Sequence, residues 1–217
     1  MKYLFIGAHL DDIELAAGGL IAKLIDNGHE AKMLCLSKSD YKNWQGITLR
    51  TLDQAMEEGN RAAEILGCKL TVFDFPNKDI PYNSEVVEAI EAEISIFQPD
   101  FIFTHNVNDT HQSHIGTAQS TLSAARRNNT VMMFEPIYPS GRALIPFRPD
   151  VYVDISNYLD KKIEALKAHK SQYEKYSDQW IQAVIARAKF RGFENGMQYA
   201  ECFELCRMEL RIEKIKK

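Results

Sequence analysis

Residues 3–14 read YLFIGAHLDDIE, an apolar run followed directly by a turn rich in imidazole and carboxylate groups. The apolar run from Tyr3 to Ala8 predicts a buried strand. A helix ending at Asn27 and Gly28 is predicted next by apolar residues at helical spacing, which are Leu15, Leu20, Ile21, Leu24 and Ile25. The chain therefore opens with a strand, a polar turn and a helix.

The alternation of strand and helix continues through the first two thirds of the chain. Apolar runs predict strands at 31–36, 70–73 and 101–104. Helical patterns occupy 49–66, a segment from the capping residue Ser84 to Phe97, and about 114–127. Strands joined by helices require right-handed crossovers, so we predict an α/β fold with a doubly wound, Rossmann-like, mainly parallel sheet flanked by helices.

The last third of the chain departs from this alternation. Residues 131–154 are rich in proline and predict a strand, a long irregular loop and a second strand at 151–154. Two helices, to about Tyr176 and Phe190, a turn at 192–196 and an apolar stretch ending near Leu210 follow. We interpret 1–217 as one domain, with a βαβα core at 1–130 and a substrate-shaping loop and C-terminal helices at 131–217.

Composition excludes several classes of protein. The net charge of -4, from 30 acidic and 26 basic residues, offers no basic face for nucleic acid. Four cysteines are too few for a disulfide framework, so we expect free thiols. Acidic residues directly after the first apolar run argue against a signal peptide, and no uncharged apolar stretch approaches the ~20 residues of a membrane span. We therefore expect a cytoplasmic protein.

Segments rich in histidine, aspartate and asparagine follow two of the predicted strands, HLDD at 9–12 and HNVNDTHQSH at 105–114. Ligands of open parallel sheets bind beyond the carboxyl ends of the strands. A dinucleotide does not suit the first turn, because the turn lacks the G-x-G-x-x-G spacing and its carboxylates would repel a pyrophosphate. Two imidazoles and a carboxylate instead suit a divalent metal and leave a coordination position for water.

The spacing within each segment suggests how an ion would be bound. His9 and Asp12 are three residues apart, so both can reach one ion as the helix begins, while Asp11 points elsewhere. His111 and His114 have the same spacing. One of them can complete the metal site while the other faces the substrate, and the sequence leaves open which.

The motif GAHLDD at 7–12 together with the later His-x-x-His resembles the PIG-L/LmbE family of metal-dependent de-N-acetylases. Weaker family stretches follow in order: AAEILG at 62–67, DIS at 154–156, KSQ at 170–172 and GMQYAECF at 196–203. The resemblance implies an LmbE-like fold and a hydrolase that removes acetyl from an N-acetylated amino sugar or GlcNAc conjugate. It also implies a cofactor, Zn²⁺ or another divalent ion such as Fe²⁺, and allows a homo-oligomer.

The resemblance also implies roles for individual residues. It makes His9, Asp12 and His114 the metal ligands, Asp11 the general base, and a protonated His111 the stabiliser of the oxyanion.

Three positions depart from the family pattern. Leu10 stands where the family has proline, and Ser113 stands where it often has aspartate. Arg50 is the candidate substrate-binding residue, although it lies more than a helical turn before the family's arginine.

Other chemistry-bearing residues have simpler interpretations. We expect His29, His105 and His169 to be structural residues of solvated loops, and Cys202 and Cys206 to be buried. A solvated helix face is expected for Glu57, Glu58, Arg61 and Glu64. Segments 37–48, with Tyr41 and Trp44, and 131–150, with residues 134–138, are candidates for substrate contact, the first as a lid.

Two alternatives to the deacetylase remain open at this point. The first is a metal-dependent hydrolase of another amide or an ester, which would share the same site. The second is a phospho-receiver-like module in which Asp11, Asp12 and Asp74 hold Mg²⁺. The second alternative gives no role to the His-x-x-His motif, and the chain is ~100 residues too long for one such module.

Overall fold

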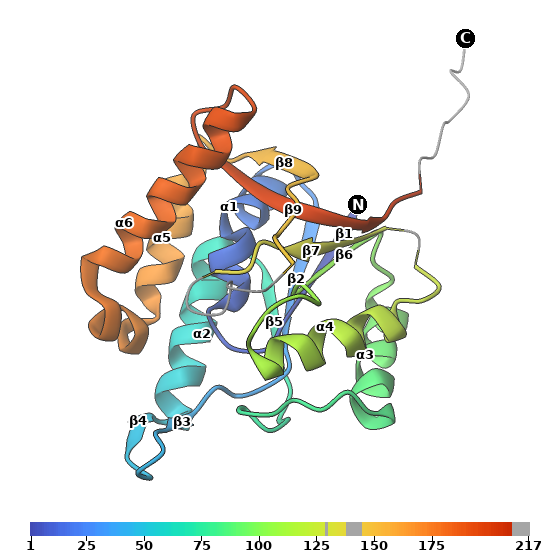
Figure 1. The fold of residues 1–217 in the computed structure, drawn as a ribbon, viewed down its shortest axis with the longest axis vertical. Helices are drawn as coiled ribbons and strands as arrows, with labels where there is room; N and C mark the ends of the chain where they lie inside the picture. Colours follow the sequence, from blue (N-terminus) through green and yellow to red (C-terminus); the bar gives the residue numbers. More distant parts are fainter. Residues whose placement is uncertain (129, 138–144, 210–217) are drawn as a thin grey trace.

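The computed structural model describes residues 1–128, 130–137 and 145–209. A seven-stranded sheet in the order β5-β2-β1-β6-β7-β9-β8 forms its centre (Figure 1). The parallel part contains β1 (Lys2–Gly7), β2 (Glu30–Cys35), β5 (Lys69–Val72), β6 (Phe101–Thr104) and β7 (Val131–Phe134). β9 (Ala200–Arg207) runs antiparallel to β7 and to the edge strand β8 (Val151–Asp154). The predicted α/β fold with a mainly parallel sheet is confirmed.

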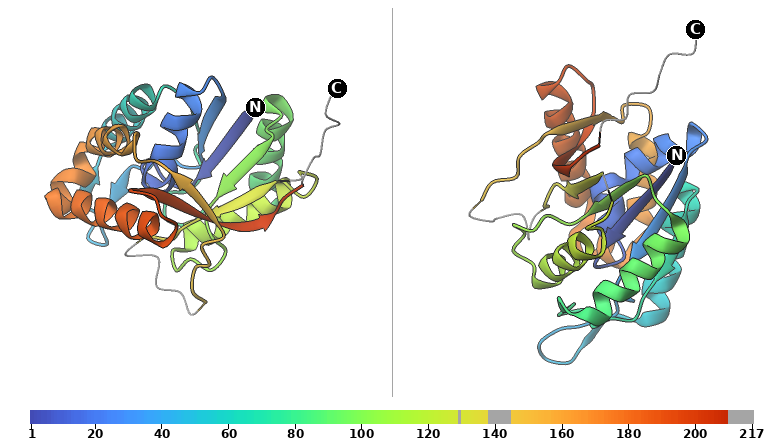
Figure 2. Two further views of the ribbon diagram at one scale, coloured as in Figure 1. Left: turned by 90° about the horizontal axis from the view of Figure 1, so that it is seen from above. Right: turned by 90° about the vertical axis from the view of Figure 1, so that its right-hand side faces the viewer.

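Helices cover both faces of the sheet (Figure 2). One apolar core joins the sheet to α1 (Asp12–Asp26), α2 (Leu52–Leu66) and α5 (Leu159–Ala168). A second core joins the opposite face to α3 (Ser84–Phe97) and α4 (Gln112–Ala124). Successive side chains of a strand point to opposite faces, so Phe5 enters the first core while Leu4 and Ile6 enter the second. The outer helix α6 (Lys170–Glu194) packs on α5.

The order of strands around β1 determines where a ligand site can form. β1 pairs with β2 on one side and with β6 on the other, with Phe5 opposite both Met33 and Phe103. The chain moves outward from β1 through β2 to β5 and then returns to the other side of β1 as β6. This reversal makes β1 and β6 the switch point of the sheet, and ligands of open α/β sheets bind beyond the carboxyl ends of strands at such a point. The two polar segments follow these two strands.

Several predicted helix boundaries are wrong. The helix expected from residue 49 begins at Leu52, because β4 (Thr48–Arg50) pairs with β3 (Tyr41–Lys42) in a separate hairpin. Thr51 then caps α2 by accepting the Gln54 backbone N–H. α3 is capped by Asn83 and not by Ser84, and α4 begins at Gln112, two residues earlier than expected.

The C-terminal third adds strands as well as helices to the fold. Its helices separate at His169, and α6 contains a break at Ser177, where φ is 56°. The strands β7, β8 and β9 belong to the same sheet as the first part of the chain, so the sheet runs across the expected division at residue 130. Residues 138–144 of the expected loop and the expected end near Leu210 lie outside the described residues.

Two expectations about exposure are wrong. Glu58, expected on a solvated helix face, is buried beside Arg50, and Cys206, expected to be buried, is exposed on β9. Cys202 is buried as expected, and all four cysteines are free thiols. None of the described helices is both long and apolar enough to cross a membrane.

Candidate metal centre and active site

Two turns at the carboxyl edge of the sheet bring six ionisable side chains together. The first turn leads from β1 into α1, and the second leads from β6 into α4. We call the group the histidine cluster, and its members are His9, Asp12, His105, Asp109, His111 and His114. The structure therefore brings together the two polar segments that lie about a hundred residues apart in the sequence.

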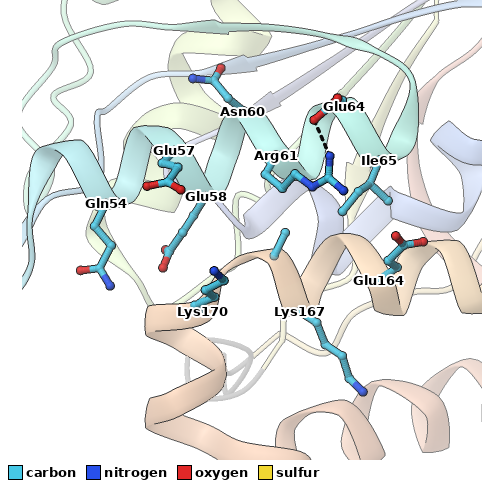
Figure 3. A pocket seen from close by; sticks show the side chains of 11 residues that line it. Gln54, Glu57, Glu58, Asn60, Arg61, Glu64, Ile65, Glu164, Lys167 and Lys170 are labelled. Carbon is cyan, nitrogen blue, oxygen red and sulfur yellow. Dashed lines mark hydrogen bonds and ion pairs between the residues drawn. The ribbon is translucent and has the colours of Figure 1, made fainter.

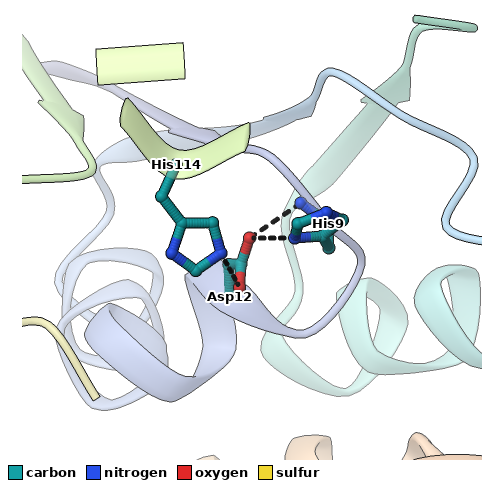
Figure 4. A group of neighbouring side chains, drawn as sticks. All are labelled: His9, Asp12 and His114. Carbon is teal, nitrogen blue, oxygen red and sulfur yellow. Dashed lines mark hydrogen bonds and ion pairs between the residues drawn. The ribbon is translucent and has the colours of Figure 1, made fainter. Parts of the chain in front are cut away.

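The three predicted metal ligands lie at the centre of the histidine cluster (Figure 4). Asp12 Oδ2 is 3.2 Å from His9 Nδ1, and Asp12 Oδ1 is 3.4 Å from His114 Nε2. The three possible ligand atoms all lie within 4.8 Å of one another. Two imidazole nitrogens and a carboxylate oxygen at this separation are a donor set that fits a divalent cation.

The second nitrogen of each imidazole is held by a neighbour. Asp109 Oδ2 lies 2.9 Å from His114 Nδ1, and the Asn77 carbonyl lies 3.0 Å from His9 Nε2. These contacts turn His114 Nε2 and His9 Nδ1 toward Asp12. Ser113, at the position where the family often has aspartate, donates to the same Asn77 carbonyl at 3.0 Å.

Sequence reasoning missed Asp109 and Asn77. For Asp109 the available signal was a carboxylate in the same turn as the His-x-x-His motif. Nothing in the sequence indicates that Asn77 would act through its backbone carbonyl.

The charges of the site favour a bound cation. Burial raises the pKa of Asp12, but His114, His105 and His9 outweigh it and hold that pKa well below its usual range. Burial lowers the pKa of His114, yet Asp12 and Asp109 raise it to about 10. His114 thus carries a proton between two carboxylates, at the position where a metal ion would supply the positive charge instead.

His105 belongs to this site and is not a solvated loop residue as expected. Its ring stacks on His114 with centroids 4.0 Å apart, and Nε2 lies 3.1 Å from Asp12 Oδ2. Burial, followed by the charge on His114, lowers the pKa of His105 to about 4. The imidazole is therefore neutral, and Nε2 accepts the Ala8 backbone N–H at 3.0 Å.

Asp11 occupies a strained position between the two predicted ligands of the first turn. Its φ of 139° is rare for a residue with a side chain, and its carboxylate makes no capping hydrogen bond to α1. Burial, followed by the neighbouring Asp12 carboxylate, raises the pKa of Asp11 to about 6. A carboxylate with this pKa is ionised at neutral pH and can accept a proton.

His111 caps α4 and faces the same centre. Its ring lies 4.5 Å from that of His114, and its Nδ1 accepts the Ser113 backbone N–H at 3.3 Å. Burial, followed by His114 and His9, lowers the pKa of His111 to about 4. The structure therefore indicates a neutral imidazole whose Nε2–H is available as a donor, in place of the protonated imidazole that we expected.

Arg50 lies behind the first turn in a second buried group, which we call the arginine network. Its members are Glu14, Arg50, Glu58, His169 and Ser171. Arg50 donates to the Leu10 carbonyl at 3.1 Å and to Glu58, and its side chain is only 4% exposed. His169 is fully buried in this network, so the expectation of a solvated residue is wrong for it too.

The remaining candidates lie apart from the histidine cluster. Trp44, in the turn between β3 and β4, is 88% exposed, and a contact between this hairpin and substrate stays a prediction. Asp74 follows β5, and its carboxylate pairs with Lys38 at 2.6 Å. The phospho-receiver alternative required Asp74 to act with Asp11 and Asp12, and this ion pair does not favour it.

A groove of about 950 Å³ lies elsewhere, between α2 and α5 (Figure 3). Its lining is mostly the charged outer surface of these helices, including Glu57, Arg61 and Lys167. Glu58, a member of the arginine network, also reaches this groove.

Comparison with known proteins identifies the family. Residues 4–125, more than half of the chain, match the family described as PIG-L, GlcNAc-PI de-N-acetylase. The chain belongs to the PIG-L family. It is accordingly a hydrolase of the deacetylase type, and both polar turns fall within the part that matches the PIG-L family.

Relatives of this PIG-L protein span most of its length. Diacetylchitobiose deacetylase from Thermococcus kodakarensis is 27% identical, over 92% of this chain and 81% of the relative. The solved structure of the N,N'-diacetylchitobiose deacetylase from Pyrococcus horikoshii has the same fold, with a TM-score of 0.81 and 22% identity over 95% of this chain and 84% of that one. A Pseudomonas putida protein named 4-oxalmesaconate hydratase is 23% identical, and the match covers 78% of this chain and 73% of the length of that protein.

Proposed function

We propose that this PIG-L protein is a metal-dependent deacetylase that removes the acetyl group from an N-acetylated amino sugar or GlcNAc conjugate. The observation that carries the proposal is the convergence of His9, Asp12 and His114 beside Asp11, at the switch point of the sheet. The relatives named as diacetylchitobiose deacetylases support an N-acetylhexosamine as the substrate.

His9, Asp12 and His114 are the proposed metal ligands, through Nδ1, a carboxylate oxygen and Nε2. A divalent ion such as Zn²⁺ or Fe²⁺ held there would polarise the acetamide carbonyl and acidify water. Asp109 and the Asn77 carbonyl keep the two imidazoles turned toward the ion.

Asp11 is the proposed general base and acid. Its carboxylate takes a proton from the water whose oxygen adds to the acetamide carbon. The C–N bond then breaks, and Asp11 returns that proton to the leaving nitrogen, so the products are acetate and a free amine. His111 is the proposed donor to the negative oxygen of the tetrahedral intermediate, through the Nε2–H that its neutral ring carries.

A second chemistry is possible on the same fold. One relative is named 4-oxalmesaconate hydratase, and a hydratase adds water to its substrate without hydrolysing an amide. Hydrolysis of another amide or of an ester would use the same residues as the proposed reaction. These alternatives differ from the proposal in substrate and not in the proposed metal ligands.

The test measures acetate release and metal content on the same sample. The protein is stripped by a chelator, restored with Zn²⁺ or Fe²⁺, and incubated with N,N'-diacetylchitobiose and other N-acetylglucosamine conjugates. We expect release to disappear on stripping and to return with one equivalent of metal. Equal release by stripped and restored protein contradicts the metal mechanism. Absence of release from every conjugate, with consumption of 4-oxalmesaconate, contradicts the deacetylase.

Some finer expectations are part of the proposal and rest on the sequence. They are a cytoplasmic location, assembly into a homo-oligomer, and the absence of a nucleic-acid partner.

A further inference from the structure

The backbone of Asp11 needs an external constraint. A φ of 139° is energetically unfavourable for a residue with a side chain, so surrounding contacts must maintain it. The Asp11 side chain does not help, because it makes no capping hydrogen bond to α1. The Asp11 carbonyl accepts the Leu15 N–H at 2.9 Å as α1 begins, and the peptide that precedes Asp11 is held by contacts from outside α1.

Leu10 is held on three sides. Its N–H donates to Ser39 Oγ at 2.7 Å, and its carbonyl accepts from Arg50 Nη1 at 3.1 Å. Its side chain is 2% exposed and packs on Ala55 of α2. A Cβ on Gly59 would lie 2.6 Å from the Leu10 side chain, so a larger residue at this position of α2 would displace Leu10. The carbonyl held by Arg50 belongs to the peptide that joins Leu10 to Asp11, and that peptide plane sets the φ of Asp11.

Arg50 is itself fixed in place. Its Nε and Nη2 lie 3.1 and 2.8 Å from Glu58 Oε2. Glu58 projects from α2 toward the start of α6 (Figure 3), where it accepts the N–H and the hydroxyl of Ser171, each at 2.7 Å.

His169 completes the constraint on Arg50. Arg50 Nη2 lies 3.2 Å from His169 Nδ1, and His169 Nε2 lies 2.9 Å from Glu14 Oε1. A guanidinium only donates, so His169 Nδ1 accepts and its proton resides on Nε2, which donates to Glu14. The guanidinium is therefore oriented by α1, α2 and the junction of α5 and α6.

We infer that Arg50 is a positioning residue, which holds the Leu10–Asp11 peptide so that the Asp11 carboxylate stays aimed at the reacting centre. This inference rests on the proposed function, because it takes Asp11 as the base. It differs from the substrate contact that the sequence predicts for Arg50, and the two roles have opposite kinetic signatures. Loss of a positioning group lowers kcat, whereas loss of a contact made equally to substrate and transition state raises KM.

The experiment compares Arg50→Lys with wild type in kcat, KM and metal content. Lysine keeps the charge but lacks the forked donors that reach Leu10 and Glu58 together. We expect kcat to fall about 10- to 100-fold, because a small displacement of a reacting group has effects of that size, with KM within about 2-fold and metal content unchanged. Arg61→Lys is the matched control on α2, because Arg61 pairs with Glu64 at the exposed surface. We expect this variant to have the kcat and KM of the wild type.

Glu58→Gln and a crystal structure of the variant test the same role of Arg50. If Arg50→Lys does not fold, Glu58→Gln is assayed instead, because glutamine has the shape of glutamate but binds the Arg50 guanidinium less tightly. We expect Glu58→Gln also to lower kcat without raising KM. An increase in KM at unchanged kcat, in whichever of the two variants is assayed, overturns the positioning role. If the wild type releases no acetate, the proposed function fails, but a crystal structure of the folded variant still decides the role of Arg50. A changed φ at Asp11 supports it, and a φ still near 139° overturns it.

Discussion

The histidine cluster and the arginine network meet at the turn after β1, and both are built from imidazoles and carboxylates. In the histidine cluster, Asp12 faces nitrogens of three histidines, and the side chains of His9, Asp12 and His114 are 17%, 11% and 11% exposed. In the arginine network, the side chains of Arg50, Glu58, Glu14 and His169 are 4%, 5%, 1% and 0% exposed.

The difference lies in how the charges are compensated. The arginine network gives each of these groups a partner inside the network, because Glu58 pairs with Arg50 and Glu14 accepts the His169 Nε2–H. In the histidine cluster, the charge that most stabilises the Asp12 carboxylate is the proton on His114, which a cation can replace. The arginine network, which is closed to solvent, is therefore suited to hold the backbone of the first turn. The histidine cluster is more accessible, and the proton on His114 can be replaced by an ion.

The largest expected effect follows from removing a proposed ligand. His114→Ala should contain no bound metal and should release acetate no faster than buffer, because two ligands do not hold the ion. Metal analysis and acetate release measure this, and circular dichroism confirms that the variant is folded. His29→Ala, which alters a histidine outside the cluster, should retain both properties. Full metal content in His114→Ala would remove this residue from the ligand set.

Asp11→Asn separates binding of the ion from proton transfer. It should keep its metal and lose about 100- to 10,000-fold in kcat, because the amide cannot accept the proton. Asparagine tolerates positive φ as well as aspartate does, so the turn should persist. Asp74→Asn, at the surface pair with Lys38, is the control with unchanged kcat. Metal loss in Asp11→Asn would mean that Asp11 is a ligand and not the base.

Glu58→Ala tests the arginine network through stability. It leaves the buried Arg50 guanidinium without its carboxylate, and breaking such a pair costs about 3–5 kcal/mol in the free energy of unfolding. Glu64→Ala breaks another glutamate–arginine pair of α2 that is exposed, and it should change the free energy by less than about 1 kcal/mol. Urea unfolding measures both variants. Equal losses would show that burial does not distinguish the two pairs.

The smallest expected effect concerns the residue behind His114. Asp109→Asn should weaken metal binding by about 10- to 100-fold, because the carboxylate that orients His114 Nδ1 is replaced by a neutral amide. Competition against a chelator of known affinity measures the change. An unchanged metal affinity would mean that the helix α4 alone positions His114.

Much of the fold follows from local patterns. The apolar runs predicted β1, β2, β5, β6 and β8 within one or two residues. The start of α2 was misplaced because Thr48–Arg50 pairs with Tyr41–Lys42 across a turn, and a helical apolar pattern cannot show such a partner. The strand character of residues 200–207 likewise depends on β7 and β8 on either side.

The sequence by itself determined the chemistry available to this protein. The spacing of His9 with Asp12 and of His111 with His114 was enough to predict a metal site from local geometry, whereas the choice of His114 as ligand and of Asp11 as base came from the resemblance to the family. Only the tertiary structure decided which neighbours complete the site. Asp109, His105, Asn77 and Arg50 act through contacts between elements that are distant in sequence, and their roles depend on burial and on strand order, which no single segment encodes.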